Sequence, residues 1–406
     1  MRHSWIVAFL LVFSAGLYVF GSGAFLGGPA DDSSLEGLKS LPYVQWSDVE
    51  EGEESLKGVV NYERGKAYPG YNLFNYDDGT QAQILDMEGR VVHIWHRNRS
   101  DYRDHGWNQV RMDDEGNLYA IVRDKALLKL DWDSNVLWSV EVPAHHDVAF
   151  SEDGSVYVYT RKQITIDHDG GEIPILNDYI TVLSPDGSVV KALSVYGLFS
   201  HLIPQGRLDT IAQIKGQVPP ERLNIIKDTI FDVFHSNTLE VIDRPIPGLC
   251  DAGALLVSIR EINTIALVDV EGERVLWSWG QGVLDGQHHP TLLDGGRILL
   301  FDNGRNWGYS RVIEVDPLSG EIVWEYKGEP PTSFYSEKRG AAQRLPNGNT
   351  LITESDRGHV FEITPDKEIV WEYYSTEMNI VEMKRRTIYR FLRLTPEDVE
   401  NTPLAG

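Results

Sequence analysis

The chain has 406 residues, of which 61 are Asp or Glu and 37 are Lys or Arg, so its formal net charge is −24. This balance argues against a nucleic-acid partner, because phosphate binding needs an exposed basic surface. It also argues against broad adhesion to anionic lipid. An anionic substrate would need a local group of cationic side chains, so clusters of His and Arg stand out. The single cysteine, Cys250, excludes an intrachain disulfide.

The N-terminal segment Trp5–Gly28 carries no charge over 24 residues. It is long enough to span a bilayer and longer than the apolar region of a typical signal peptide. Arg2 precedes the segment and Asp31 follows it, which places the N-terminus in the cytoplasm by the positive-inside tendency. We therefore expect residues 1–28 to be a transmembrane signal anchor, with the rest of the chain on the extracytoplasmic side, periplasmic or extracellular. A signal peptide cleaved near Ser22–Ala24 is the alternative.

The remaining sequence divides into three parts by composition. Residues 29–56 are acidic and rich in Ser, Gly and Glu, which predicts a linker. Residues 57–378 alternate short strand-like runs with Asp, Asn and Gly turns, and no helix-length amphipathic segment interrupts them. Residues 379–406 form a short basic tail, either packed as a helix on one face of the domain or exposed to solvent or the membrane surface. Its cations are Lys384, Arg385, Arg386, Arg390 and Arg393.

A repeated pair, an apolar residue followed by Trp, marks the β-rich part. The tryptophans are Trp95, Trp138, Trp277, Trp324 and Trp371, with steps of 43, 139, 47 and 47 residues. The long step equals about three repeats, and Leu193 marks one missing boundary. Repeats of about 40–50 residues with four short strands each predict an all-β fold, a six-bladed β-propeller, with seven blades as the alternative. We expect the tryptophans to be core residues and Gly70–Tyr76 to be the strand that closes the ring.

A polar residue recurs eight positions before a turn glycine: Asn108 before Gly116, His146 before Gly154, and His288 before Gly296. In a propeller, the residues that begin the innermost strands converge on one axial pocket from different blades. The candidates for a shared polar site are Asn108, His105, His146, His201, His235, His288 and His289.

Several axial histidines suit either a metal ion or an oxyanion held by imidazolium and guanidinium donors. The sequence contains no HExxH or CxxC spacing, no glycine-rich phosphate loop and no GxSxG elbow. Arg260, Arg305 and Arg311 follow His235 or His288 at 17 to 25 residues. An arginine would oppose a metal ion but assist a sulfate or phosphate. We therefore favour the oxyanion and expect no metal and no cofactor.

Ordered segments of the β-rich part carry a family resemblance. They are AYPGYNLFN with LDMEGRVVHIW, HHDVAFSEDGSVYV, FHSNTLEVID with LVSIREINTIALVD, QHHPTLLDGGRILLFDNG with YSRVIEVD, and GAAQRLPNGNTLI with GHVFEITPDKEIVWEYY. The order of His-Ser-Asn, Ser-x-Arg, Gln-His and Phe-Asp-Asn-Gly resembles the arylsulfotransferase (aryl-sulfate sulfotransferase) family. The resemblance covers most of residues 57–393.

This resemblance implies a propeller whose axial His and Arg side chains hold a sulfuryl group. Such enzymes transfer sulfate from a phenolic sulfate ester to a phenol through a sulfohistidine, without a nucleotide donor. The implied partners are thus a small phenolic sulfate and a phenol acceptor. Carried over to this chain, His235 and His288 bind the sulfuryl group, and Arg305 is the arginine, with Arg311 as its substitute.

The chain departs from the family pattern at the nucleophile. The usual histidine precedes an aromatic-Tyr-Ser sequence, and here the matching stretch 330–336 has Pro331 or Thr332 at that place. Either another axial histidine, His146, His288 or His289, attacks sulfur, or the chain does not catalyse the reaction.

Three hypotheses follow. The first is a sulfotransferase in which the reacting residues are His288, His235, His146 and Arg305, and the substrate-binding residues are Asn237, Arg260, His289, Asn303 and Arg311. The second is a catalytically silent extracytoplasmic propeller that serves as a binding or assembly module. The third is a metal-dependent hydrolase.

Overall fold

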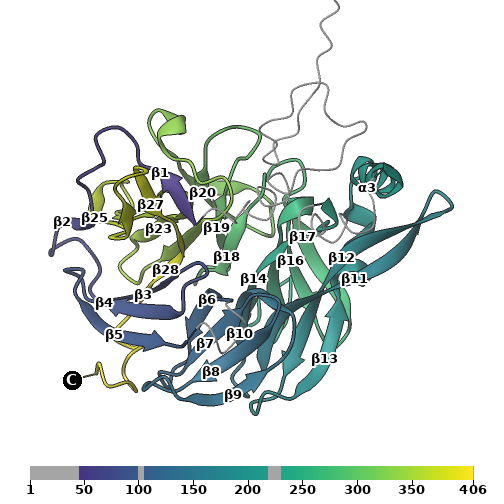
Figure 1. Ribbon diagram of the computed structural model, residues 1–406, viewed down its shortest axis with the longest axis horizontal. Coiled ribbons are helices and arrows are strands. Elements are labelled where there is room, and N and C mark those ends of the chain that lie inside the picture. The colour runs from purple at the N-terminus through teal and green to yellow at the C-terminus, as the bar shows by residue number, and fades with distance from the viewer. Residues whose placement is uncertain (1–44, 99–104, 218–229, 406) are drawn as a thin grey trace, which may run out of the picture.

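The computed structural model describes residues 45–98, 105–217 and 230–405. Across these residues the chain forms six antiparallel sheets of four or five strands and one smaller sheet of three strands. The innermost strands of the six sheets contact one another in turn around a closed ring, which is the arrangement of a β-propeller (Figure 1). The all-β prediction is confirmed.

Four of these sheets are each built from one continuous run of four strands, in which the first strand lies at the axis and the last at the rim. The second sheet in chain order contains β6 (Trp107–Met112), β7 (Leu118–Val122), β8 (Ala126–Leu130) and β9 (Val136–Val140). The third contains β10 (Ala144–Phe150), β11 (Val156–His168), β12 (Gly171–Leu183) and β13 (Val189–Ser194). The fourth contains β14 (Ser236–Val241), β15 (Leu255–Ile259), β16 (Thr264–Asp269) and β17 (Arg274–Trp279). The fifth contains β18 (His288–Leu292), β19 (Ile298–Asp302), β20 (Arg311–Val315) and β21 (Ile322–Tyr326).

The first and sixth sheets draw strands from both ends of the described chain. The first sheet contains β3 (Tyr71–Tyr76), β4 (Gln81–Leu85) and β5 (Val91–His96), and its innermost strand is β28 (Ile388–Leu394). The sixth sheet contains β22 (Ala341–Arg344), β23 (Thr350–Glu354), β24 (His359–Ile363) and β25 (Ile369–Tyr374), with β2 (Gly58–Tyr62) at its outer edge. The small sheet is formed by β1 (Trp46–Asp48), β27 (Lys384–Arg386) and β26 (Met378–Asn379).

Ring closure differs from our expectation in one respect. The expected closing strand does lie at the junction, since Leu73 of β3 pairs with Leu392 of β28. The strand brought from the far end of the chain is, however, β28. The prediction of a tail over residues 379–406 is therefore wrong for Ile388–Leu394, which is an axial strand. Closure in this way satisfies the inner edge of β3 and leaves no open ladder there.

The basic residues of this C-terminal segment are not an exposed group. Arg393 pairs with Glu362 at 3.0 Å, and both side chains are fully buried. Arg390 pairs with the buried Asp147 at 3.0 Å. The anionic partners of these arginines come from other sheets. The sequence shows the cations but not these partners, so the segment resembled a solvated tail.

The predicted linker and anchor fall largely outside the described residues. Trp46–Asp48 pairs with Lys384–Arg386, so the second half of the predicted linker 29–56 contributes to the fold. The expected transmembrane segment 1–28 lies outside the described residues. Within the part of the chain that the structure describes, no helix is long and apolar enough to cross a membrane.

The marker tryptophans lie on β5, β9, β17, β21 and β25, the fourth strand from the axis in each sheet, and four of them stand beside the register shift of that strand, with Trp95 two residues further on. Trp95 and Trp371 are fully buried, and the other three are half-buried. Three of their indole N–H groups donate to a backbone carbonyl in the next sheet, at Asp131, Pro185 and Met87. The repeat therefore has a physical reason, because each of these rings packs and hydrogen-bonds across a sheet boundary.

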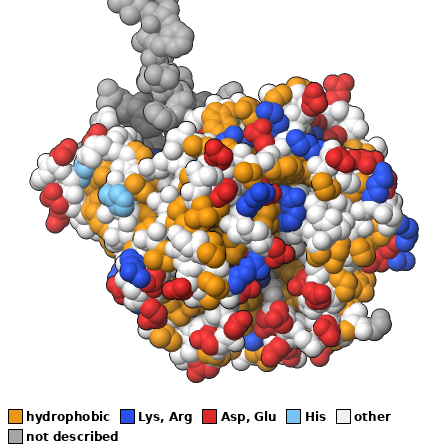
Figure 2. Space-filling model, turned by 180° about the vertical axis from the view of Figure 1, so that it is seen from behind, with side chains coloured by type: hydrophobic (Ala, Val, Ile, Leu, Met, Phe, Trp, Pro, Cys, Tyr) orange, Lys and Arg blue, Asp and Glu red, His pale blue; other side chains and the backbone are white. Residues whose placement is uncertain are grey.

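The sequence analysis missed the helices between β13 and β14. The chain there forms α2 (Val195–Phe199), η2 (Ser200–Leu202) and α3 (Gln205–Gln217), and α3 lies against the long hairpin of β11 and β12 (Figure 1). The sequence of α3 is mostly polar, and its contacts with the core come from a short apolar face of Leu208, Ile211 and Ala212. On the opposite face of the molecule, Figure 2 shows acidic side chains scattered among hydrophobic ones, with Lys and Arg in small groups.

Candidate functional site

The axial site is built on irregular starts of the innermost strands. Each of the innermost strands β6, β10, β14, β18 and β28 has a β-bulge near its start. There the pairing with the next strand shifts in register, because the innermost strand contains extra residues. Bulges of this kind re-aim side chains. The residues within these shifts include Asn108, His146, Asn237, His289 and Tyr389. The predicted repeat of polar residues at one point of each sheet thus corresponds to a repeated bulge.

Three of the predicted histidines share one neighbourhood. The rings of His146 and His235 lie 4.5 Å apart between centroids. Burial lowers the pKa of His288 well below its ordinary value, and the nearby Arg260 and His235 lower it further. The structure does not bring His105 and His201 into this group, since both are exposed and His201 belongs to η2.

The hydrogen bonds of His288 fix which ring nitrogen carries the proton. Its Nδ1 lies 3.0 Å from the carbonyl oxygen of Gly286 and 2.7 Å from Oδ1 of Asn303. The amide of Asn303 is oriented in turn, because its Nδ2 donates to the carbonyls of Ser336 and Arg339. Both partners of Nδ1 are therefore acceptors, so Nδ1 holds the hydrogen and the Nε2 lone pair stays outside these bonds.

His235 and His146 have different partners. Nδ1 of His235 lies 2.6 Å from Oδ2 of Asp232, and its backbone N–H donates to Oδ1 of the same carboxylate. Nδ1 of His146 lies 2.7 Å from Nδ1 of His145, so one of these nitrogens donates and the other accepts. Burial lowers the pKa of His146 well below its ordinary value, and the charges on His235 and His145 act in the same direction. His235 is thus the member of this group whose ring is held by a carboxylate.

Two of the predicted arginines join this site through one carboxylate. Arg260, in η3 (Arg260–Ile262), donates to Oε1 of Glu261 at 2.6 Å, and Arg305 donates to the same oxygen at 2.9 Å. A Cβ on Gly286 would lie 2.5 Å from Nε of Arg305, so the guanidinium packs directly over the residue whose carbonyl holds His288. The site therefore contains two cations, one anion and a neutral imidazole side by side.

Three further arginines near the axial histidines were not predicted from the sequence. Arg123 and Arg339 both pair with the buried Asp77, at 3.0 and 2.6 Å. Arg161 makes a two-pronged ion pair with Asp124 at 2.7 and 2.6 Å. A signal was present in the sequence, because an arginine beside an acidic residue follows the second strand of several sheets. The instances are Arg123-Asp124, Arg260-Glu261 and Asp356-Arg357.

The side chains of two predicted substrate-binding asparagines make hydrogen bonds within the protein. Asn237 is fully buried, donates from Nδ2 to the carbonyl of Gln287 and accepts from the hydroxyl of Thr238. Asn303 uses both ends of its amide, the oxygen on His288 and the nitrogen on two backbone carbonyls. Each therefore positions its neighbours, and Asn303 has no free donor for a substrate.

His289 and Arg311 also lie apart from the three grouped histidines. Nδ1 of His289 lies 2.9 Å from the carbonyl of Ala342. Burial lowers the pKa of His289 well below its ordinary value, and its nearest cations are Arg390 and Arg111, which belong to a different pair of strands. Arg311 lies on β20, donates to Asp302 and to the carbonyl of Val283, and covers the ring of Trp307. The guanidinium of Arg311 therefore contacts protein groups away from the grouped histidines.

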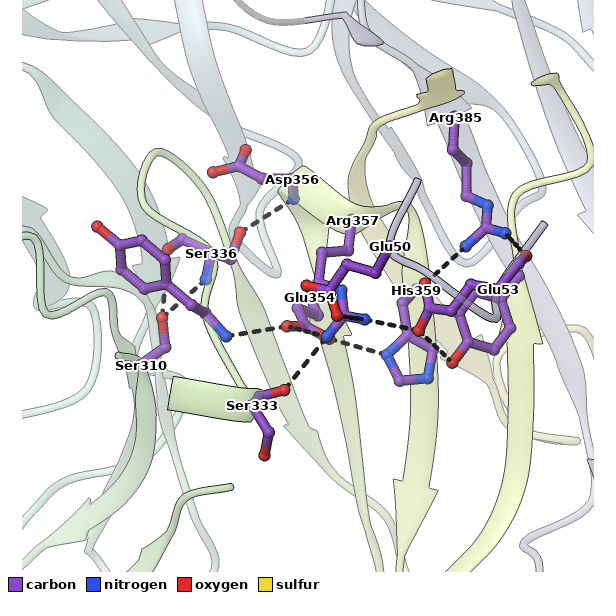
Figure 3. A network of polar contacts seen from close by, with 12 residues as sticks. Glu50, Glu53, Ser310, Ser333, Ser336, Glu354, Asp356, Arg357, His359 and Arg385 are labelled. Carbon is purple, nitrogen blue, oxygen red and sulfur yellow. Dashed lines mark hydrogen bonds and ion pairs between the residues drawn. The ribbon is translucent and has the colours of Figure 1, made fainter. Parts of the chain in front are cut away.

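The loop that matches the family's usual nucleophile position contacts His288 indirectly, through Asn303. Thr332 lies in η4 (Pro331–Ser333) and is exposed. Ser336 receives the amide of Asn303 on its carbonyl, and its own N–H donates to the hydroxyl of Ser310 at 2.9 Å. Figure 3 shows Ser336 hydrogen-bonded to Asp356, beside the network that links Glu354, Arg357 and Glu53.

The family follows from a comparison with known proteins. A family model described as Arylsulfotransferase (ASST) matches residues 89–376. The chain belongs to the arylsulfotransferase family. At the level of the family, this supports a sulfotransferase-type function with small-molecule substrates, an aryl sulfate and a phenol. A comparison with curated proteins finds no match.

Several solved structures are similar to this chain at low identity. A protein of unknown function from Bacteroides caccae is 14% identical, with a TM-score of 0.48, over 80% of this chain and 98% of its own. A streptogramin B lyase is 13% identical, with a TM-score of 0.47, over 83% of this chain and 89% of its own. The Dos1 propeller is 12% identical, with a TM-score of 0.41, over 80% of this chain and 77% of its own.

The hypothesis of a metal-dependent hydrolase requires a set of metal ligands. Among residues 45–98, 105–217 and 230–405, the group of His, Cys, Asp and Glu that could hold an ion is His168, Asp169 and Asp209. It joins the tip of the β11–β12 hairpin to α3, and the two carboxylates are exposed. None of the axial histidines belongs to it.

Proposed function

We propose that this arylsulfotransferase moves a sulfuryl group from a phenolic sulfate ester to a phenol through a covalent intermediate on His288. The observation that carries the proposal is the pair of oxygens on Nδ1 of His288, which leaves the Nε2 lone pair for attack. Burial and the charge of Arg260 lower the pKa of His288, so the ring is uncharged near neutral pH. Only an uncharged imidazole has a lone pair to offer as a nucleophile.

In the first half-reaction, Nε2 of His288 attacks sulfur, the bond between sulfur and the phenolic oxygen breaks, and the phenolate leaves with the bonding electrons. His235, whose Nδ1 is held by Asp232, supplies a proton to that phenolate from Nε2. In the second half-reaction, the acceptor phenol gives its proton back to His235 and its oxygen attacks sulfur. The nitrogen–sulfur bond then breaks, and the lone pair returns to His288.

The sulfuryl oxygens carry negative charge throughout and need fixed donors. Arg260 and Arg305 supply guanidinium groups beside His288, and their shared partner Glu261 holds both in place. Donors that are already oriented stabilise the transferring group without reorganising during the reaction. His146 completes this set from the neighbouring sheet, next to His235.

The test is turnover of 4-nitrophenyl sulfate with and without added phenol. We expect turnover that depends on the phenol, and its loss in His288→Gln. The matched control is His201→Gln, which changes an exposed histidine outside the site and should leave the rate unchanged. Full activity in a folded His288→Gln protein would rule out this nucleophile.

A silent binding or assembly module is the second candidate. It is favoured by one observation, that Pro331 or Thr332 stands at the family's usual nucleophile position in place of a histidine. This candidate predicts that aryl sulfates leave no covalent label on the protein, and that a partner is recovered when the chain is isolated from membranes. Phenol-dependent turnover by the purified protein would end it.

We further propose that the chain is anchored by residues 1–28, with a propeller of six blades outside the cytoplasm. The uncharged run Trp5–Gly28 supports the anchor, and the six sheets of four or five strands support the blade count. External protease added to spheroplasts should cleave the propeller, and deletion of residues 2–28 should retain it in the cytoplasm. Protection of the propeller in intact spheroplasts would contradict this location.

A further inference from the structure

The carboxylate of Glu261 lies where the two site arginines meet. Its Oε1 accepts from Nη1 of Arg260 at 2.6 Å and from Nη1 of Arg305 at 2.9 Å. All three side chains are largely buried, with exposed fractions of 13% for Arg260, 19% for Arg305 and 20% for Glu261. Because water screens little at such a place, the charge of Glu261 acts on anything that the arginines bind.

Counting the charges around His288 gives a small net value. Arg260 and Arg305 contribute two positive charges, and Glu261 removes one of them. Asp285 lies 3.8 Å from Nε of Arg305, and Asp232 acts on Arg260 from the other side. His288 itself is uncharged, because burial and the neighbouring cations lower its pKa. Arg260, Arg305 and Glu261, which we call the cup, therefore carry one unit of positive charge together, while His235 and Asp232 are paired with each other at 2.6 Å.

We propose that Glu261 sets the charge selectivity of the site, so that the cup accepts a singly charged sulfuryl group and rejects a doubly charged phosphoryl group. This inference rests on the proposed function and adds a specificity-determining residue to it. A sulfate ester carries a single negative charge, whereas a phosphate monoester carries about −1.5 to −2 at pH 7. The two groups have nearly the same shape, so hydrogen-bond geometry alone separates them poorly. The second charge of a phosphoryl group would be repelled by the carboxylate of Glu261.

The same chain offers a matched control for this carboxylate. Glu314 on β20 is also shared by two arginines, Arg297 at 2.9 Å and Arg344 at 3.0 Å. Arg297 precedes β19, whereas Asn303, which holds His288, follows that strand, so the Glu314 cluster lies at the opposite end of the sheet. Glu314→Gln removes the same charge from a similar cluster away from the cup.

The experiment measures binding of three inert anions to the full-length protein at pH 8 by calorimetry. The anions are benzenesulfonate, phenylphosphonate and the monomethyl ester of phenylphosphonate, which are respectively singly, doubly and singly charged. We expect wild-type protein to bind the two singly charged anions more tightly than phenylphosphonate. In Glu261→Gln the preference for benzenesulfonate over phenylphosphonate should fall by about tenfold or more, and in Glu314→Gln it should be unchanged.

The outcomes separate this inference from the function on which it rests. If none of the three anions binds the wild-type protein, the anion site is absent and both proposals fall. If the anions bind and Glu261→Gln leaves the preference unchanged, only the role of Glu261 is overturned. If that variant does not fold, the wild-type series still decides, because equal binding of phenylphosphonate and its monomethyl ester would overturn selection by charge.

Discussion

Oδ1 of Asn303 lies 2.7 Å from Nδ1 of His288, and the amide that presents this oxygen is locked by the carbonyls of Ser336 and Arg339. Two separate sheets thereby determine which nitrogen of one imidazole is available. The loop that carries the nucleophile in the family pattern thus orients His288, the nucleophile that we propose. Asn303 is a positioning residue, because it touches the histidine and leaves no donor for a substrate.

Replacing this amide by a carboxylate should change the pH dependence of the reaction. In Asn303→Asp the new negative charge would favour the charged form of His288, so its pKa should rise. We expect the acidic limb of the kcat/KM profile to move up by about one to three pH units, with lower activity at neutral pH. A folded variant with an unchanged profile would show that Asn303 does not act through His288.

The two arginines that follow β19 should respond differently to removal. Arg305→Met takes a charge-assisted donor from the cup, and kcat/KM should fall by about tenfold to a hundredfold. Arg311→Met leaves Asp302 buried without its partner, so we expect a lower melting temperature with kcat/KM unchanged. Steady-state kinetics and thermal unfolding of both variants provide the comparison. Equal kinetic losses would place Arg311 in the site after all.

The fold was predictable where local sequence repeats reflect a local structural cause. The Trp repeat indicated the sheets because Trp95, Trp138 and Trp371 each fasten one sheet to the next. The closing strand was misassigned because the pairing of Leu73 with Leu392 joins residues at opposite ends of the chain. No local pattern records such a pairing, and the basic residues in that segment obscured it.

The buried ion pair behind the closing strand should be sensitive to the loss of one partner. Arg393→Met leaves the carboxylate of Glu362 fully buried and unpaired. We expect a loss of about 3–5 kcal/mol in the free energy of unfolding, measured by denaturant titration. The double variant Arg393→Met with Glu362→Gln should recover part of that loss, since the uncompensated charge is gone. Additive effects of the two changes would contradict the pairing.

The site was predictable to a lesser degree than the fold. The spacing of His146 and His288 before turn glycines indicated axial positions, and the repeated bulges explain it. The roles of Asn237, Asn303 and Arg311 were not recoverable, because each depends on partners from other strands. His201 shows the opposite error, since its spacing suits the axis but the residue is exposed in the short helical turn η2.

Glu240 should make the protein less stable as the pH rises. Burial raises the pKa of its carboxyl from 4.5 to about 7, so ionisation costs more in the folded chain than in the unfolded one. The stability of the wild-type protein relative to Glu240→Gln should be highest below about pH 4.5. It should fall by on the order of 1–3 kcal/mol as the pH rises from about 4.5 to about 7, and then level off.

Denaturant titrations of both proteins from pH 4 to pH 9 test this dependence. Glutamine keeps an oxygen that can accept the N–H of Leu292, so the comparison isolates the charge. The exposed Glu321→Gln serves as control and should show no such trend. A pH-independent difference between the wild-type protein and Glu240→Gln would be inconsistent with a buried, shifted carboxyl.

The central claim is that His288 carries the sulfuryl group between donor and acceptor. Its most direct test is mass spectrometry of peptides from protein incubated with 4-nitrophenyl sulfate in the absence of phenol, under alkaline conditions that preserve a nitrogen–sulfur bond. We predict a sulfuryl adduct on the peptide that contains His288, which disappears when phenol is added and is absent from His288→Gln. An adduct on a different histidine, or phenol-dependent turnover with no adduct on His288, would contradict the account.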